Sequence, residues 1–321
     1  MPIIHVNHMT KIYVTNQNVT NKPVHWFGKT NKKKIYGVNN ISFDIEKGET
    51  VGYIGLNGAG KSTTIKLLTG IMKPTEGNVI VSSFDPFNER KKLAKHIGVV
   101  FGQRNQLWWD LPLIDSFELL KEIYSVPNTE YRMRMNKLIE ILKVNEFLNM
   151  PIRQLSLGQR MRGNLIASLL HNPDILFLDE PTLGLDIDSR HEFIEFIKSL
   201  KKNKITIFLT THNMRDIEEL CERIIILDKG QIIYDGDLSS IYDNTFGKYV
   251  IIAKVKCIDN TDLKFQPDPQ GIIRIQARDE IEKEVIINNI LKRCMVENIS
   301  IMENNLEGYL LSKTGGRHAE I

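Results

Sequence analysis

The sequence has few cysteines, no long apolar run and almost no net charge. Its three cysteines, Cys221, Cys257 and Cys294, are widely spaced and odd in number, which predicts neither a disulfide framework nor a metal site. No run approaches the roughly 20 apolar residues that cross a bilayer, and no basic region followed by an apolar stretch indicates a secretory signal. Lys and Arg total 42 against 39 Asp and Glu, a balance that argues against nucleic acid as a partner. We therefore expect a cytosolic protein that reaches any membrane only through a partner protein.

A glycine-rich segment, residues 55–63, follows a predicted buried strand at 50–54 and precedes a predicted helix. It fits the phosphate-loop pattern G-x-x-x-x-G-K-[ST], in which glycines let backbone N–H groups approach phosphate oxygens and the helix N-terminus adds its dipole. Lys61 can reach the β- and γ-phosphates, and the Ser62 hydroxyl can bind Mg²⁺. The sequence therefore predicts a nucleoside triphosphate site made by Gly55, Asn57, Gly58, Gly60, Lys61, Ser62 and Thr63.

The pattern around this loop predicts an α/β domain. After a first strand at 3–13, residues 14–36 are polar and rich in turn formers, and we interpret them as a long inserted loop. Helical periodicity over about 104–165 predicts a helical subdomain. Strands and helices alternate over 175–227, which favours a parallel sheet with helices on its faces.

A change of composition near residue 245 predicts a second, smaller α+β domain. We place the domains at 1–244 and 245–321, the second ending in a short helix at 306–312. At 321 residues, the chain is long enough for one large and one small domain. No residue pattern in the second domain indicates a chemical role.

Further segments indicate what the triphosphate is used for. An apolar strand at 175–178 ends in Asp179 and Glu180, a Walker B pattern, with Asp179 placed to hold Mg²⁺ and Glu180 placed to polarise an attacking water. Four other segments complete the set: Gln103 after the strand 97–101, Leu-Ser-Leu-Gly-Gln at 155–159, Leu-Gly-Leu-Asp at 183–186, and His212 after the strand 205–209.

In this order the segments resemble the nucleotide-binding subunit of an ABC transporter, over about residues 3–240. They match its phosphate loop, Q-loop, signature, Walker B, D-loop and H-loop. The resemblance implies a P-loop NTPase fold, an ABC-type ATPase domain with a mixed-sheet core and an inserted helical subdomain. It also implies ATP and Mg²⁺ as cofactors, and a head-to-tail dimer with a second nucleotide-binding subunit, identical or related.

The family's residue roles carry over to matching positions. Glu180, His212 and Gln103 would be catalytic, with His212 on the γ-phosphate in cis, and Ser62, Gln103 and Asp179 would surround Mg²⁺. Gln103 could also be an ordinary loop residue. The D-loop residue would be Asp186. The signature in trans would be Ser156, Leu157, Gly158 and Gln159. Of these, Ser156, Gly158 and Gln159 would contact the partner's γ-phosphate, at the start of a helix over 158–170.

This sequence departs from the family pattern in two places. Leu157 stands where the second signature position is usually glycine, and the insert at 14–36 separates Tyr13 from the next strand. Tyr13 is our candidate for the aromatic that stacks on adenine. Trp26 and Phe27 are rivals for that contact, and Tyr13 could instead be a plain strand residue.

The sequence segments 102–109 and 303–310 resemble segments of type 2 ABC exporter ATPases that are described as sodium- or drug-efflux-like. This predicts an ATPase that powers export through a separate multi-span permease, peripheral on the inner face of the cell membrane. Trp108 and Trp109 could anchor that permease or pack inside the helical subdomain. The basic run 32–34 could touch lipid head groups or be a solvated loop.

A soluble ABC-type ATPase that acts in assembly, repair or translation is the alternative. Repair ATPases of this type carry long coiled coils between the two Walker motifs, and the segment from Lys61 to Asp179 is too short for them. Translation factors of the family usually carry two such domains on one chain, and this chain carries one.

Overall fold

The computed structural model describes residues 2–17, 31–102, 106–244, 249–257, 267–268 and 271–303. The chain forms two compact units, residues 1–235 and 236–321. Each unit has a hydrophobic core of its own. The division falls before the boundary expected at 244/245, because α8 (Leu238–Asn244) belongs to the second unit.

A six-stranded sheet forms the centre of unit 1, with strand order β5-β6-β7-β3-β8-β9. Its strands are β3 (Thr50–Gly55), β5 (Ile97–Phe101), β6 (Ile175–Asp179), β7 (Thr206–Thr210), β8 (Arg223–Asp228) and β9 (Gln231–Asp237). The pairs from β5 to β8 are parallel, as the alternation of strands and helices predicts. Every residue of β3 is buried, which is typical of a strand covered on both faces. The phosphate loop therefore leaves the sheet from an interior strand.

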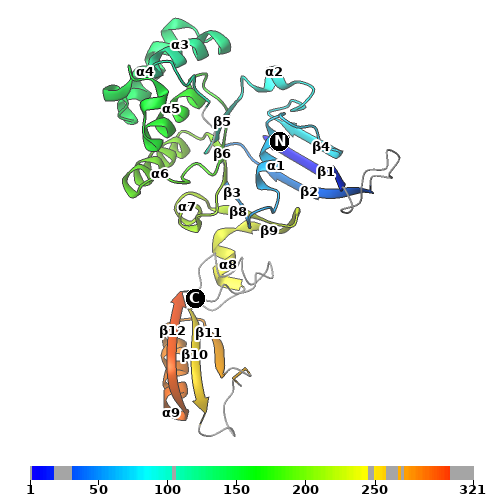
Figure 1. Cartoon of the computed structure of the whole chain (residues 1–321), viewed down its shortest axis with the longest axis vertical. Coiled ribbons are helices and arrows are strands. Elements are labelled where there is room, and N and C mark those ends of the chain that lie inside the picture. The colour runs from blue at the N-terminus through cyan, green and yellow to red at the C-terminus, as the bar shows by residue number, and fades with distance from the viewer. Residues whose placement is uncertain are drawn as a thin grey trace, which may run out of the picture. The chain divides into compact units, whose positions relative to one another are not determined.

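A second, antiparallel sheet consists of β1 (Ile4–Gln17), β2 (Asn31–Ile45) and β4 (Glu76–Val81), in the order β2-β1-β4. In Figure 1 this sheet and the helical subdomain lie on opposite sides of β3 and β6. The interpretation of 14–36 as a loop is wrong at both ends, because β1 and β2 stay paired from Val14↔Lys34 to Gln17↔Asn31. The side chains of 14, 15, 33 and 34 are exposed, so no apolar alternation marks these strand ends. Residues 18–30, with Trp26 and Phe27, lie outside the described residues.

The helices of unit 1 flank the sheets (Figure 1). They are α1 (Lys61–Leu68), α2 (Arg90–Leu93), α3 (Leu113–Tyr124), α4 (Asn128–Ile141), α5 (Leu157–Leu169), α6 (Ile187–Lys202) and α7 (Met214–Leu220), with 3-10 turns η1 (Asn145–Phe147) and η2 (Ile152–Gln154). α3, α4 and α5 form the expected helical subdomain. No sequence pattern predicts α2, because a four-residue helix is too short to show a periodicity.

Aromatic rings fill the core beneath the phosphate loop. Phe208 lies 5.0 Å from Tyr53 and 5.7 Å from Phe177 between ring centroids, and all three side chains are fully buried. The Tyr53 hydroxyl lies 3.0 Å from the Thr64 hydroxyl of α1, and burial raises the pKa of Tyr53. Strands β3, β6 and β7 and helix α1 are thereby packed as one body.

Unit 2 is a small α+β domain. It contains β10 (Tyr249–Cys257), β11 (Ile272–Ala277), α9 (Glu280–Arg293) and β12 (Cys294–Glu303), and the antiparallel sheet has the order β11-β10-β12. Ile286 and Ile290 of α9 join the sheet residues Ile251 and Ile275 in its core. The helix expected at 306–312 lies outside the described residues. Among the described helices of the chain, none is long and apolar enough to cross a membrane.

Phe208→Ala should destabilise unit 1 by about 3–5 kcal/mol, because it leaves a cavity among packed rings. Phe208→Leu should cost clearly less, since it keeps part of the buried area. Urea unfolding followed by tryptophan fluorescence tests this, because the three tryptophans, Trp26, Trp108 and Trp109, all belong to unit 1. Phe87→Ala, at a side chain 45% exposed, is the control and should change stability little. An equal, small loss for all three variants would contradict this account of the core.

Candidate functional site

A cavity of about 770 Å³ lies where the carboxyl ends of β3, β6 and β7 meet. Open parallel sheets bind ligands at this edge. Most of the sequence-predicted residues line it. The lining residues are Tyr13, Ile35, Tyr36, Gly37, Asn57, Gly58, Ala59, Gly60, Lys61, Ser62, Thr63, Lys66, Phe101, Gly102, Asp179, Glu180, Leu183 and His212.

The phosphate loop needs glycine for its shape. Gly60 has φ 114°, and a Cβ there would lie 2.2 Å from the Gly37 carbonyl oxygen. A Cβ on Gly55 would lie 2.3 Å from the Leu227 oxygen. These close approaches start α1 directly against the cavity, with its free backbone N–H groups at the cavity wall. Such a wall suits an anion.

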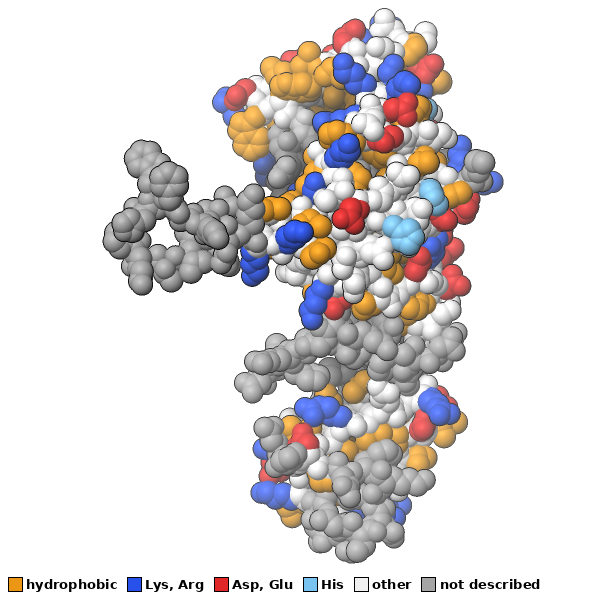
Figure 2. All heavy atoms as spheres, turned by 90° about the vertical axis from the view of Figure 1, so that its right-hand side faces the viewer, with side chains coloured by type: hydrophobic (Ala, Val, Ile, Leu, Met, Phe, Trp, Pro, Cys, Tyr) orange, Lys and Arg blue, Asp and Glu red, His pale blue; other side chains and the backbone are white. Residues whose placement is uncertain are grey.

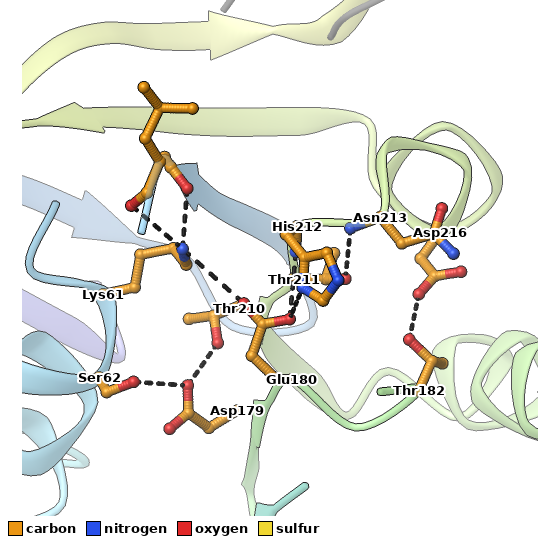
Figure 3. A network of polar contacts seen from close by, with 12 residues as sticks. Lys61, Ser62, Asp179, Glu180, Thr182, Thr210, Thr211, His212, Asn213 and Asp216 are labelled. Atoms are coloured by element: carbon orange, nitrogen blue, oxygen red, sulfur yellow. Dashed lines mark hydrogen bonds and ion pairs between the residues drawn. The ribbon is translucent and has the colours of Figure 1, made fainter. Parts of the chain in front are cut away.

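Lys61 is a nearly buried cation in this wall, with 7% of its side chain exposed. Its Nζ donates to the Gly55 oxygen at 2.8 Å and lies 3.7 Å from Glu180 Oε1 (Figure 3). A buried ammonium requires such partners, because desolvation alone is costly. Lys61 is therefore held at the cavity by groups of the protein itself.

Asp179, the last residue of β6, accepts hydrogen bonds from two hydroxyl groups on one carboxylate oxygen. Thr210 Oγ1 donates to Asp179 Oδ1 at 2.6 Å, and Ser62 Oγ donates to the same atom at 3.2 Å (Figure 3). Thr210 ends the neighbouring strand β7, and Ser62 is on α1. The sequence-predicted pair Ser62 and Asp179 is thus brought into direct contact across 117 positions of the chain.

Glu180 is held at the centre of the cavity by an unusual backbone conformation. Its φ is 53°, in the left-handed region that costs a non-glycine residue roughly 1–3 kcal/mol. The backbone N–H of Glu180 donates to the Thr210 oxygen at 2.9 Å, which fixes the turn. As Figure 3 shows, Glu180 Oε2 then meets His212, which contributes its backbone N at 3.1 Å and its ring Nδ1 at 2.6 Å. Glu180 therefore lies between His212 and Lys61.

Two aromatic side chains lie on the cavity wall near the phosphate loop. Tyr13 is half-buried, with its hydroxyl 3.3 Å from Thr63 Oγ1 and 3.6 Å from Met72 Sδ. Tyr36, on the neighbouring strand β2, is 48% exposed and was missed by the sequence analysis. No local sequence pattern marks Tyr36, which lines the cavity because β2 pairs with β1 and places Tyr36 opposite Ile12.

The signature segment begins α5. Ser156 caps this helix in a reciprocal capping box, in which Gln159 N donates to Ser156 Oγ at 3.2 Å and Ser156 N donates to Gln159 Oε1 at 2.8 Å. A Cβ on Gly158 would lie 2.3 Å from Ser189 Oγ, and Leu157 packs on Gly184. Among the described residues that line the cavity, none comes from 156–159. The structure therefore does not bring the signature together with the phosphate loop of the same chain.

The two remaining site predictions differ in outcome. Asp186 is the N-cap of α6: its Oδ1 accepts the Ser189 backbone N–H at 2.8 Å, and this bond lowers the pKa of Asp186. Gln103 lies outside the described residues, so the structure gives it no position. The neighbouring Gly102 is close to the site, since a Cβ there would lie 2.0 Å from the Glu180 oxygen.

Trp108 and Trp109 are 39% and 48% exposed, so they are not packed inside the helical subdomain. Arg160 of α5 lies over the Trp109 ring at 5.4 Å. Figure 2 shows further hydrophobic side chains at the surface of the end of unit 1 that Figure 1 assigns to α3 and α4. The exposed apolar residues there include Leu119, Ile123 and Met133. Exposed apolar patches of this kind mark interaction surfaces.

A family model described as "ABC transporter" matches residues 38–183. The ABC transporter ATP-binding protein NatA of Bacillus subtilis (strain 168) is 32% identical over 227 residues, which cover 70% of this chain and 92% of that protein. The linearmycin resistance ATP-binding protein LnrL of the same organism is 30% identical over 302 residues, covering 89% of this chain and 97% of that one. Among solved structures, an ATP-binding cassette described as a dimer in a post-hydrolysis state bound to ADP and Pi has a TM-score of 0.62 and 28% identity, over 73% of this chain and 98% of its own.

The two tyrosines of the cavity can be tested separately. Tyr13→Ala and Tyr36→Ala should each weaken binding of ATP by about fivefold or more in Kd, because stacking of one base on an aromatic ring contributes about 1–3 kcal/mol. The Phe variants at both positions keep the ring and should bind as the wild type does. Fluorescence titration with a labelled ATP analogue measures the Kd. An unchanged Kd for Tyr36→Ala would remove Tyr36 from the adenine contact.

Proposed function

Because the chain belongs to the ABC transporter family as an ATP-binding subunit, we propose that its cavity hydrolyses ATP with Mg²⁺ to drive export through a separate membrane permease. The observation that carries this proposal is the convergence of Lys61, Asp179, Glu180 and His212 at one edge of the sheet. This convergence supports roles for Lys61 as the phosphate-binding cation, Asp179 as the metal-binding carboxylate and Glu180 as the base. These are the groups that phosphoryl transfer to water requires.

The donor set fits Mg²⁺. Ser62 Oγ and Asp179 Oδ1 are hard oxygen donors 3.2 Å apart, and Mg²⁺ is usually held by one or two protein oxygens together with substrate phosphates. Gln103 would add a third oxygen from the segment after β5. When bound, Mg²⁺ supplies charge neutralisation on the β- and γ-phosphates.

Lys61 would exchange partners when the nucleotide binds. In the structure its Nζ lies 3.7 Å from Glu180 Oε1, and a triphosphate on the loop would give it a stronger, doubly charged partner. Glu180 would then be free to accept a proton from the attacking water as a general base. His212, on the other side of Glu180, would keep that carboxylate oriented and reach the γ-phosphate.

A second nucleotide-binding subunit would complete the site. The N-terminus of α5 would serve as an anion site, and among the described residues none of 156–159 lines the subunit's own cavity. In a head-to-tail dimer, Ser156, Leu157, Gly158 and Gln159 of one subunit would close over the ATP of the other. Asp186, directly beside the signature through Ser189, would lie in the same interface.

The permease would dock on unit 1 next to the segment 102–109, which keeps the chain peripheral on the cytoplasmic face of the membrane. A groove of about 280 Å³ opens there between β5, α3 and α5, lined by Ile71, Val99, Gln106, Leu120, Tyr124 and Ala167 among others. Trp108 and Trp109 are exposed in the same segment. Aromatic side chains of this kind are common anchors of protein interfaces. Export as the direction is supported by the resemblance of 102–109 to exporters and by the resistance function in the name of LnrL.

Glu180→Gln should lower the rate of ATP hydrolysis about 100-fold or more, because the amide cannot take the proton of the attacking water. ATP binding should remain, so the variant should accumulate as an ATP-bound dimer. Gel filtration with Mg-ATP measures this against the wild type, which should return to the smaller species as ATP is consumed. Lys61→Ala is the control that should neither bind ATP nor dimerise. A Glu180→Gln variant that hydrolyses ATP at the normal rate would contradict the proposed site.

Replacing both Trp108 and Trp109 by Ala should reduce co-purification of the permease from detergent extracts, while ATP binding stays normal. The reason is the loss of two exposed anchors beside the groove. Ile281→Ala in unit 2, at a side chain 75% exposed, is the control for loss of surface apolar area. Absence of any multi-span protein from the wild-type extract would favour the soluble assembly, repair or translation factor instead.

A further inference from the structure

Asp216 is a fully buried carboxylate on α7, and none of the roles described above uses it. Its side chain is 1% exposed. It lies four residues after His212, in the first turn of the helix that the His212 segment leads into. Buried carboxylates are rare, and they require complete pairing.

Both oxygens of Asp216 have partners. Oδ2 accepts a hydrogen bond from the Thr182 hydroxyl at 2.5 Å, and Oδ1 accepts one from Arg190 Nε at 2.6 Å. Arg190 also donates to Glu219 at 3.1 Å, so one guanidinium serves two carboxylates of α7. The negative charge of Asp216 is thus balanced, and its position is fixed from two sides.

The Thr182–Asp216 bond joins the same two segments as the Glu180–His212 contact. Thr182 follows Glu180 by two residues, and Asp216 follows His212 by four. The two cross-links therefore close a small ring through the segment after β6 and the segment after β7, and Figure 3 shows them side by side. The Glu180 N–H bond to the Thr210 oxygen joins the two segments where they leave β6 and β7, and the Thr182–Asp216 bond adds a cross-link further along both segments.

Arg190 adds a third segment to the same carboxylate. It belongs to α6, whose N-cap is Asp186. The segments that carry Glu180, Asp186 and His212 therefore meet at Asp216, away from the cavity itself. A single buried carboxylate is thus connected to all three segments.

We propose that Asp216 is a positioning residue for ATP hydrolysis, acting through Thr182 and Arg190 to hold Glu180 and His212 in their contact. This inference rests on the proposed function. It requires that loss of the Thr182 bond slows the chemical step without weakening ATP binding, because Lys61 and the phosphate loop are held by other contacts. A displacement of a catalytic group by a fraction of an ångström to 1 Å is enough to slow a reaction markedly.

A second cluster of one arginine and two carboxylates provides a control for the Asp216 cluster. Arg223 of β8 donates to Glu49 at 3.0 Å and to Asp235 at 2.8 Å, so it too is a partly buried guanidinium between two carboxylates. Glu49 precedes β3, at the opposite end of the strand from the phosphate loop. Glu49→Gln therefore perturbs a similar cluster far from the site.

The experiment measures kcat for ATP, the Kd of a fluorescent ATP analogue, and the melting temperature. Thr182→Val keeps the side-chain shape and removes the hydroxyl, Thr182→Ser keeps the hydroxyl, and Asp216→Asn removes the charge. Thr182→Val and Asp216→Asn should lower kcat about 10- to 100-fold with Kd within about twofold of wild type. Thr182→Ser and Glu49→Gln should keep near-normal kcat.

A normal kcat in Thr182→Val would overturn the inference, as would a loss of kcat that Glu49→Gln matches at equal melting temperature. If Asp216→Asn does not fold, the comparison of Thr182→Val with Thr182→Ser tests the inference by itself. A wild-type chain that binds the analogue but does not hydrolyse ATP refutes the proposed function, and the inference with it. Active wild type with unaffected variants refutes the inference only.

Discussion

In the central sheet, β6, β7 and β3 are adjacent and parallel, so their carboxyl ends open at one edge. Asp179, Thr210 and Gly55 occupy these three ends, and Glu180, His212 and Asn57, one or two residues further on, line the cavity. The aromatic packing of Tyr53, Phe177 and Phe208 fixes the strands beneath them. The spacing of these three strand ends therefore follows from backbone pairing and core packing.

The charges of the site are balanced by the protein. Lys61 is nearly buried, yet it has the Gly55 carbonyl and Glu180 as partners, and Glu180 in turn has His212. A triphosphate changes this balance, because it attracts Lys61 and repels Glu180. In the proposed mechanism, Glu180 is therefore paired with Lys61 until the nucleotide binds. In the structure, Glu180 has a left-handed backbone conformation and lines the cavity.

The sequence predicted the order of strands and helices in unit 1 well, because the chemistry-bearing motifs lie at the ends of short, strongly apolar strands. The 175–178 run followed by Asp179 and Glu180 is the clearest example, and the strand extends by one residue in the structure. The positions of Lys61, Ser62 and His212 on one cavity could be expected from parallel pairing alone. Whether each performs its expected role stays a prediction.

Other features depend on contacts that no local pattern reveals. The β1–β2 hairpin continues through polar, exposed residues, because its ladder is formed by backbone groups. Tyr36 reaches the cavity only because this hairpin brings it beside Tyr13, and Asp216 meets Thr182 and Arg190 only in the folded chain. The position of Tyr36 and the contacts of Asp216 can be predicted only when the segments that are neighbours in space are known.

The signature segment shows how two sites could be linked in the proposed dimer. Gly158 has no room for a Cβ against Ser189, and Leu157 packs on Gly184, so the start of α5 is fitted directly onto the segment that follows Glu180. Leu157, which departs from the family's usual glycine, thereby forms part of this contact. Arg190 then ties the same segment to Asp216 and α7. A shift of Glu180 in one subunit would be transmitted through a few packed residues to the signature that serves the other, because close-packed groups cannot move independently.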